Sequence, residues 1–469
     1  MYYQSKEHNF MLSLMTGESL TKQINVFLCQ SRFGSFFIQQ LVLDTPCFYR
    51  GCFVWEKRRY FRTAEILAKF AVMQVFTSAS RIIITCHKWL SPALQQEVIA
   101  LGYTIERAFQ TGVELRGTVN DCIRLNLQLR CASQVMYSLK AFHCDHPDTL
   151  YQNLQDLPWE ELIRPDGYFS VTSNVFHPTI QTNLFANLRV KDAVVDRMRN
   201  KTGKRPSTGS ELSGAVVYLF WKHEEAEIFL DTSGETLAKH GYRKLPGKAP
   251  MLEALAAATI LSTKWDRKTP FINPMCGSGT LAIEAALIAT NRRPGLLRKN
   301  YAFMHITGYD ATVYEKAMEE LQQQVTEVPG LVVIASDRSE LAVSVAKTNA
   351  AAAGVEKLIS FEVCDFEKTT VPPAAGGVIM FNPEYGERLG DEIELNATYA
   401  RMGDFLKNAC KGYTGYVFTG NLDLAKKIRL KPSRRIEFFN ATIDCRLLEY
   451  ELYAGTKRDD KQPSGTIEV

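Results

Sequence analysis

The sequence predicts an α/β protein whose C-terminal half is built on a mainly parallel sheet, preceded by smaller α+β units. Two observations in that half predict this architecture. An apolar run from Phe271 breaks at Pro274, Gly277 and Gly279 and then becomes an Ala-rich segment, which is the pattern of a strand, a tight turn and a helix. Strand-like and helix-like segments alternate from there to about residue 457. Such alternation favours parallel strands connected by helices.

The later elements follow from the same alternation. Short apolar runs predict strands at 331–335, 359–362, 378–381 and 415–419, with a last pair at 434–440 and 447–454. Apolar residues at helical spacing predict helices at 251–263, 281–289, 341–353 and 397–410.

The composition is that of a globular protein of two or three domains, because 46% of the 469 residues are hydrophobic and 23% are charged. A net charge of +4 does not by itself indicate a nucleic-acid partner. The eleven cysteines form no CxxC pair and show no metal-ligand spacing, so we expect buried thiols and no metal. Neither a signal peptide nor an apolar run long enough to cross a bilayer is present, which predicts a cytoplasmic protein without a membrane partner.

Residues 1–72 mix aromatic residues, cysteines and arginines without a sustained period, and no function is assigned to them. One hypothesis is that Met73 is the biological start. The other is that this extension is a basic aromatic arm that stacks on RNA bases. The next segment, 73–142, predicts an α+β unit with strands near Ile82 and at 112–117 and helices at 92–101 and 121–129.

The segment from Lys191 to Pro206 predicts an amphipathic helix that leads into a cationic loop. Ala193, Val194 and Met198 are expected on its buried face. Lys and Arg suit RNA phosphates because they release condensed counterions, although a solvated basic face has the same pattern. The candidate RNA-binding residues are Lys191, Arg197, Lys201, Lys204 and Arg205.

Two less regular segments complete the chain. Residues 236–250, rich in Gly, Pro and cations, are interpreted as a linker, in which His240 is either a surface residue or a ligand contact. Residues 458–469 are expected to be a mobile tail.

Two stretches carry the chemistry. In the turn from Asn273 to Thr280, the glycines let a ligand approach the backbone, and the free N–H groups at the start of the next helix attract electronegative groups. The cluster Asn382-Pro383-Glu384-Tyr385 follows an apolar run at a strand's carboxyl end, which is where ligands lie in an open α/β sheet.

Together these stretches resemble the class I S-adenosylmethionine-dependent methyltransferases that methylate exocyclic amines through an Asn/Asp-Pro-Pro-aromatic motif. The closer resemblance is to RNA methyltransferases with an N-terminal THUMP domain, including the bacterial large-subunit rRNA guanine-N2 methyltransferases. It covers residues from about Met73 to about Lys457. The chain departs from the family pattern at Glu384, where proline is usual, and at Asn273, where an acidic residue is common.

The resemblance implies a ferredoxin-like unit at 73–142, a THUMP domain at 143–235 and a Rossmann-like class I methyltransferase domain at 251–457 with an antiparallel edge. It also implies S-adenosylmethionine as cofactor and S-adenosylhomocysteine as product. Asp337, at the end of a strand, is expected to accept the ribose hydroxyls, and Asp365 the adenine amine. The candidate cofactor-binding residues are Asn273, Cys276, Gly277, Ser278, Gly279, Thr280, Asp337 and Asp365.

The expected catalytic residues are Asn382, Pro383, Glu384 and Tyr385. The side-chain oxygen of Asn382 and the carbonyl of Pro383 can accept the hydrogens of the target amine, while Tyr385 stacks on the base. Glu384 either reads guanine through its two neighbouring donors or faces solvent.

The leading interpretation is an RNA methyltransferase that acts on guanine N2, with rRNA as the partner. The alternatives are a DNA or RNA adenine-N6 methyltransferase and a non-catalytic RNA-binding assembly factor. The sequence leaves the modified nucleotide and the oligomeric state open.

Overall fold

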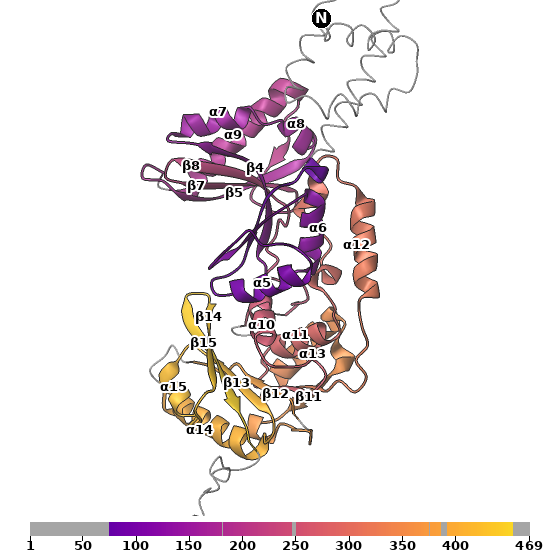
Figure 1. The fold of residues 1–469 in the computed structure, drawn as a ribbon, viewed down its shortest axis with the longest axis vertical. Helices are drawn as coiled ribbons and strands as arrows, with labels where there is room; N and C mark the ends of the chain where they lie inside the picture. The colour runs from indigo at the N-terminus through magenta and orange to yellow at the C-terminus, as the bar shows by residue number, and fades with distance from the viewer. Residues whose placement is uncertain (1–74, 181, 246–249, 375, 386–391, 454–469) are drawn as a thin grey trace, which may run out of the picture. The chain divides into compact units, whose positions relative to one another are not determined.

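The computed structural model describes residues 75–180, 182–245, 250–374, 376–385 and 392–453 (Figure 1). The extension at 1–72 and the tail at 458–469 lie outside these residues. The described chain forms two sheets, one in each half. The alternation expected after Phe271 is confirmed there, so the fold class predicted from the sequence is correct.

The N-terminal half contains an eight-stranded sheet in the order β2-β3-β1-β4-β8-β7-β5-β6. The long strand β4 pairs with β1 on one side and with β8 on the other, so one sheet runs through the ferredoxin-like and THUMP-like segments. The strands are β1 (Ser80–Thr85), β2 (Arg107–Phe109), β3 (Gly112–Gly117), β4 (Gln134–His143), β5 (Tyr168–Phe176), β6 (Ser207–Thr208), β7 (Ala215–Lys222) and β8 (Glu225–Asp231).

Local sequence explains where the helices of this half begin and end. Thr118 and Asp121 form a capping box at the start of α6, each accepting a hydrogen bond from the other's backbone N–H. Helix α9 ends at Gly203, which adopts a left-handed conformation with φ of 70°. The helices are α5 (Ser91–Ala100), α6 (Val119–Gln128), α7 (Pro147–Gln155), α8 (Trp159–Leu162) and α9 (Asn183–Thr202).

The C-terminal half contains a seven-stranded sheet in the order β11-β10-β9-β12-β13-β15-β14. The first five strands are parallel, and β15 runs antiparallel to both β13 and β14, as expected for the edge. The strands are β9 (Phe271–Pro274), β10 (Val333–Asp337), β11 (Ile359–Val363), β12 (Val378–Phe381), β13 (Thr414–Thr419), β14 (Arg434–Asn440) and β15 (Ile443–Glu451).

Helix α11 follows the glycine turn, and every one of its residues is buried. It packs against β9 and β10 and against α10 and α13. The helices of this half are α10 (Glu253–Leu261), α11 (Thr280–Ala289), α12 (Ala311–Gln323), α13 (Glu340–Ala353), α14 (Glu392–Ala409) and α15 (Leu422–Lys426). Four short 3₁₀ helices also occur, η1 (Pro294–Leu297), η2 (Ala302–His305), η3 (Glu356–Leu358) and η4 (Phe366–Lys368).

Two helices of the C-terminal half were not expected from the sequence, α12 and α15. Helix α12 packs against α6 of the N-terminal half, so its apolar face is covered by a distant part of the chain (Figure 1). The cysteines follow the expectation, because all the described ones are free thiols and all except Cys364 are buried.

His240 is not on the surface, because its side chain is fully buried, and both of its ring nitrogens have partners within the protein. Its Nδ1 lies 2.7 Å from Glu284 Oε1 on α11, and its Nε2 lies 2.9 Å from the carbonyl oxygen of Arg130. Burial alone would lower the pKa of His240, but the charge of Glu284 and these hydrogen bonds raise it above its ordinary value. The linker is thereby joined to both halves.

This pair predicts a pH-dependent stability. Because folding raises the pKa of His240, its protonated form stabilises the protein below about pH 6.5, and this contribution is lost as the pH rises through the folded-state pKa. We expect His240→Gln to lower the free energy of unfolding at pH 6 by about 3–5 kcal/mol, since Glu284 loses its partner. The difference from wild type should shrink at pH 9 in urea titrations. His143 is exposed, and His143→Gln is the matched control. An equal difference in stability between His240→Gln and wild type at both pH values would contradict the role of His240.

Candidate active site

The glycine turn after β9 has an unusual backbone. Met275, Gly277 and Gly279 all have positive φ, of 55°, 55° and 80°. A left-handed conformation costs a residue with a Cβ, such as Met275, about 1–2 kcal/mol, so the surrounding structure must hold it in place. The turn is held by two backbone hydrogen bonds of 2.9 Å, from Cys276 N–H to the carbonyl of Ser336 and from Gly279 N–H to the carbonyl of Cys276.

Asp337 ends β10 and fixes the turn from the neighbouring strand. Its Oδ2 accepts a hydrogen bond from Gly277 N–H at 3.0 Å, and its Oδ1 accepts one from Ser339 N–H at 2.9 Å. Each carboxylate oxygen has a second lone pair, so Asp337 can still accept two hydroxyl groups. The structure therefore brings together Gly277 and Asp337, which the sequence placed in one cofactor site.

The two glycines of the turn face different surroundings. A Cβ built on Gly277 meets no atom within 4 Å, so this position opens onto free space. A Cβ on Gly279 would lie 2.8 Å from Cβ of Ala346 on α13. The missing side chain of Gly279 therefore allows α11 and α13 to pack closely, and its expected role in cofactor binding stays a prediction.

Arg243 is a residue of this site that the sequence analysis missed. Its guanidinium donates to Ser278 Oγ at 3.0 Å, to Thr280 Oγ1 at 3.2 Å and to the carbonyl of Met251 at 2.7 Å. It also donates to the buried Glu253 at 3.2 Å. The hydroxyl oxygens of Ser278 and Thr280 therefore accept hydrogen bonds from Arg243, while each hydroxyl still has its own hydrogen to donate.

Asn349 of α13 holds the same linker from the other side. Its Oδ1 accepts hydrogen bonds from the backbone N–H groups of Lys244 and Leu245, at 3.0 and 3.2 Å. Its Nδ2 donates to the carbonyl oxygens of Leu245 and Ser278. Lys244 and Leu245 of the linker are thus held next to the glycine turn.

Asn273 and Cys276 are both buried at this turn. Asn273 Nδ2 donates to the carbonyl of Met380 on β12 at 2.9 Å, while its Oδ1 has no hydrogen-bond partner among the described residues. A buried acceptor without a donor is costly, and ligands often satisfy such groups. Burial raises the pKa of the Cys276 thiol well above its usual range, so this thiol is neutral.

Asp365 is the N-cap of η4 and lies just after the carboxyl end of β11. It accepts a hydrogen bond from Glu367 N–H at 3.1 Å and one from Arg401 at 2.7 Å. Partial burial opposes ionisation, but the hydrogen bond from Arg401 outweighs it and lowers the pKa of Asp365. Asp365 is therefore a charged acceptor beside β11, and Arg401 already donates one hydrogen bond to it.

Asn382 follows β12, the strand beside β9, so it lies at the same edge of the sheet as the glycine turn. The Tyr385 hydroxyl donates to Asn382 Oδ1 across a long 3.3 Å hydrogen bond. This oxygen is the atom expected to accept the target amine. In this conformation it is occupied by a side chain of the same motif.

Tyr385 is held by three neighbouring elements. Asn440 Nδ2 donates to its hydroxyl at 3.3 Å, Asn421 Nδ2 donates to its carbonyl at 3.3 Å, and its ring meets Phe418 edge to face with centroids 6.4 Å apart. Burial raises the pKa of Tyr385 to about 12, so the hydroxyl stays protonated at neutral pH. The base-stacking role expected for this ring remains a prediction.

Pro383 is buried and Glu384 is exposed. The hydroxyl of the buried Tyr399 donates to the carbonyl of Glu384 at 3.3 Å, which fixes the backbone of the motif rather than the carboxylate. The exposure of Glu384 is what the solvent-facing alternative expects. Residues 386–391, directly after the motif, lie outside the described part of the chain.

Two of the candidate RNA-binding cations of α9 have partners within the protein. Arg197 donates twice to Glu160 at 2.8 Å and once to the carbonyl of Gln155 at 2.7 Å. This geometry does not support Arg197 as a phosphate contact, because its guanidinium joins α9 to α7 and α8. Lys191 is partly covered and lies 3.5 Å from Asp192.

The other three candidates lie in the last turn of α9 or just after it. Lys201, Lys204 and Arg205 are exposed, and they form no ion pair with any residue that the structure describes. The opposite face of α9 is buried through Ala193, Val194 and Met198, as expected. These three cations are therefore free to meet phosphates.

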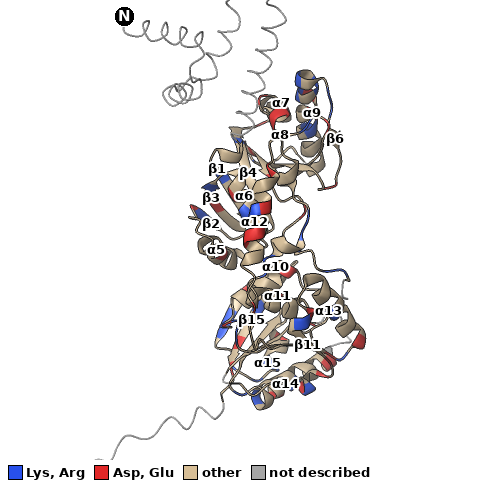
Figure 2. Ribbon diagram, turned by 90° about the vertical axis from the view of Figure 1, so that its right-hand side faces the viewer, with Lys and Arg blue, Asp and Glu red and all other residues tan. Residues whose placement is uncertain are grey.

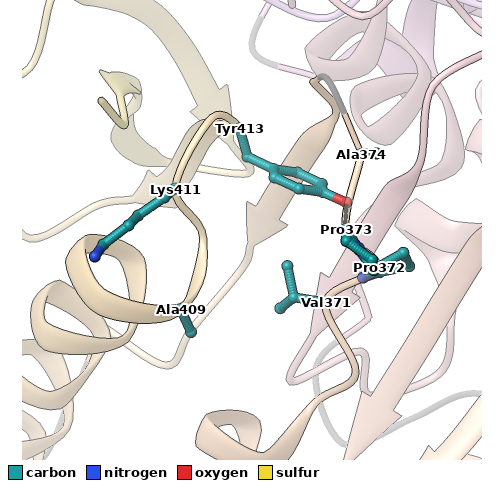
Figure 3. Close-up of a pocket in the computed structure, with 7 residues that line it drawn as sticks. All are labelled: Val371, Pro372, Pro373, Ala374, Ala409, Lys411 and Tyr413. Atoms are coloured by element: carbon teal, nitrogen blue, oxygen red, sulfur yellow. Dashed lines mark hydrogen bonds between the residues drawn. The ribbon is translucent and has the colours of Figure 1, made fainter. Parts of the chain in front are cut away.

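A separate hollow lies at the end of the second sheet where β12 and β13 begin (Figure 3). It has a volume of about 580 Å³ and is bounded by residues that precede β12 and β13, among them Pro372, Lys411 and Tyr413. The Tyr413 hydroxyl donates to the carbonyl of Pro372 at 2.6 Å. Because the candidate catalytic residues follow these strands, the hollow is not part of their site.

Three family models match the chain. An RlmL ferredoxin-like domain matches residues 81–136, a THUMP domain matches 145–231, and an RMKL-like methyltransferase domain matches 240–449. The chain carries the domains of the RMKL-like methyltransferases.

Curated relatives and a solved structure agree with these domains. The ribosomal RNA large subunit methyltransferase K/L of Syntrophotalea carbinolica (strain DSM 2380 / NBRC 103641 / GraBd1) is 36% identical over 78% of this chain and 53% of its own length. That of Pseudomonas putida (strain W619) is 32% identical over 81% and 54%. The chain thus spans about half the length of these relatives. A crystal structure from Listeria monocytogenes str. 4b F2365, described as a predicted N6-adenine-specific DNA methylase, is 29% identical, with a TM-score of 0.72 over 80% of this chain and 97% of that one.

Within the described part of the chain, no group of three or more His, Cys, Asp or Glu side chains is placed to hold a metal ion. None of its described helices combines the length and the apolar character needed to cross a membrane.

The packing of the RMKL-like domain predicts that Gly279 matters for stability. We expect Gly279→Val to destabilise the protein, because a Cβ meets Ala346 at 2.8 Å and φ is 80°. Overpacking costs about 1–3 kcal/mol and the left-handed backbone about 1–2 kcal/mol more. The Cβ of Gly277→Ala meets no atom, so this variant should lose only the stability that a left-handed backbone costs, about 1–2 kcal/mol. Thermal unfolding of both variants measures this, and equal midpoints would contradict the assigned role of Gly279.

Proposed function

We propose that this protein is an RNA methyltransferase that transfers a methyl group from S-adenosylmethionine to the exocyclic N2 amine of a guanine in large-subunit rRNA. The observation that carries the proposal is the Asn382 side-chain oxygen at the carboxyl end of β12, beside the strand that leads into the glycine turn and its partner Asp337. The names of the two curated relatives support rRNA as the substrate. The cytoplasmic location expected from the sequence stays a prediction.

The residues around the turn fit the proposed cofactor. Gly277 faces open space, Asp337 has lone pairs to spare, and Asn273 Oδ1 lacks a donor among the described residues. Asp337 would hold the ribose hydroxyls, and Asp365 the adenine amine. When bound, S-adenosylmethionine supplies an electrophilic methyl group on a sulfonium, and S-adenosylhomocysteine is the product.

The chain's own residues orient the nucleophile. An aromatic amine is weakly basic, so it needs alignment of its nitrogen lone pair more than a strong base. Asn382 Oδ1 and the carbonyl of Pro383 would accept its two hydrogens. Asn382 Oδ1 already accepts one long hydrogen bond from the Tyr385 hydroxyl and has a second lone pair for the amine. The buried surroundings of Tyr385 exclude water from the same place.

A guanine paired within a helix cannot reach this site. The target base must lie in a loop or be flipped out, which costs a few kcal/mol. Contacts with the RNA backbone can offset that cost, and the exposed cations after α9 are suited to make them.

A second candidate is methylation of adenine N6. The Listeria monocytogenes structure is described as a predicted N6-adenine-specific DNA methylase, and the Asn-Pro chemistry of the motif suits either amine. Incubation with labelled S-adenosylmethionine and either total RNA or DNA, followed by nucleoside analysis, decides between them. N2-methylguanosine is the expected product. N6-methylated adenine would favour the second candidate, and no labelled nucleoside would favour a non-catalytic assembly factor.

Asn382 provides the first test of the chemistry. We expect Asn382→Ala to lower the single-turnover rate by about 100-fold or more, because the target amine loses its positioning acceptor. Affinity for S-adenosylhomocysteine, measured by calorimetry, should stay near the wild-type value. Asn440→Ala is the matched control, since Asn440 contacts Tyr385 and not the target amine, and its rate should fall much less. A near-normal rate for Asn382→Ala would place the chemistry elsewhere.

The loop after α9 provides a test of RNA binding. Replacing Lys201, Lys204 and Arg205 together by Gln should flatten the salt dependence of RNA affinity, by about 0.7–0.9 log units per lost phosphate contact. Arg197→Gln, in the same domain, should instead lower the thermal midpoint, because it breaks the bonds to Glu160. If the triple variant keeps the wild-type salt slope, the loop is only a solvated basic surface.

A further inference from the structure

The segment 421–440 starts and ends at the candidate catalytic motif. Its first residue, Asn421, donates to the carbonyl of Tyr385, and its last, Asn440, donates to the hydroxyl of the same tyrosine, both at 3.3 Å. Between them the chain forms α15 and β14. Both ends of this segment therefore contact Tyr385.

This segment concentrates positive charge. It contains six Lys or Arg residues and two acidic ones, whereas the whole chain has a net charge of only +4 (Lys and Arg are blue in Figure 2). The cations are Lys426, Lys427, Arg429, Lys431, Arg434 and Arg435. The mild overall charge of the protein thus conceals a strongly basic surface, which we call the α15–β14 surface.

Most of these cations lack an anionic partner among the residues that the structure describes. Lys426 pairs with Asp423 at 2.7 Å, and Arg434 with the buried Glu449 at 3.3 Å. Glu437, the second acidic residue of the segment, pairs with Arg446 of β15. The other four cations are exposed and form no ion pair with a described residue; they are Lys427, Arg429, Lys431 and Arg435.

The N-terminal half adds a cation at the same place. Lys88, in the loop between β1 and α5, is exposed and lies over the ring of Phe439 at 4.2 Å from its centroid. Phe439 is next to Asn440, so the ferredoxin-like domain meets the catalytic domain beside the residue that holds Tyr385. The basic surface therefore extends across both domains.

We propose that the α15–β14 surface, with Lys88, binds the phosphates that flank the target nucleotide. The proposal rests on the proposed function for the choice of RNA. A base held at Asn382 leaves its neighbouring phosphates just outside the site, and unpaired cations on the adjoining wall are placed to meet them. Exposed Lys and Arg bind such phosphates with little dependence on base sequence. This surface is distinct from the cations after α9, which lie in the THUMP domain.

The test uses a triple variant with Lys427, Lys431 and Arg435 replaced by Gln. Arg429 is left unchanged because its φ of 57° makes substitution there harder to interpret. Binding of a fluorescent 20-nucleotide single-stranded RNA of mixed sequence is measured between 50 and 200 mM KCl, without cofactor. We expect about tenfold weaker binding and a salt slope flatter by about 0.7 log units per lost contact.

A matched variant controls for net charge. Lys316, Lys357 and Lys411 are exposed lysines elsewhere in the same domain, and replacing them by Gln removes the same charge. The control should keep the wild-type slope, and both variants should keep the wild-type thermal midpoint. If the triple variant unfolds, the single variants Lys427→Gln and Lys431→Gln replace it in the binding measurement.

Three outcomes would overturn the proposal. These are an unchanged salt slope, an equal loss in the control variant, and a loss confined to a 20-base-pair DNA duplex. Failure of the proposed function is recognised separately, because it appears as wild-type protein that methylates no RNA. Weakened RNA binding of the triple variant in that case would still support this surface.

Discussion

The candidate site depends on one carboxylate, that of Asp337. Its two oxygens accept hydrogen bonds from the backbone N–H groups of Gly277 and Ser339. These bonds fix the glycine turn after β9 and the segment before α13 to the end of β10. Hydrogen bonds to an ionised acceptor are roughly twice as strong as neutral ones. The turn contains left-handed residues, including Met275, that would otherwise relax. The same group that is proposed to bind the ribose therefore also shapes the pocket for it.

The strands and helices around the site could be predicted because their signal is local. Apolar runs and helical spacing predicted β9 to β15 and α11, since each element is determined within about ten residues of itself. The turn glycines and Asp337 were found in the same way, as residues that follow a strand. Helix α12 was missed because the surface that covers it, α6, is far away in the sequence.

The partners of charged side chains could not be predicted for the same reason. Arg243 reaches Ser278 across 35 residues, Arg197 reaches Glu160 across 37, and His240 reaches Glu284 across 44. A sequence shows that these residues carry charge, but whether the charge is exposed or neutralised depends on the fold. The fold pairs Arg197 and His240 with distant carboxylates, which gives both residues a structural role. The α15–β14 surface was not predicted because its cations lie before an edge strand and at its start, where a solvated basic face is common.

The hydrogen bond between Tyr385 and Asn382 has a consequence for substrate size. The acceptor proposed for the target amine already accepts one hydrogen bond from a side chain that Asn440 and Phe418 hold in place, so the amine would have to bind beside that side chain. A free nucleoside would bring little binding energy to meet this constraint. A folded RNA with many backbone contacts would bring much more, so under the proposed function this arrangement would favour a polymer over its monomers.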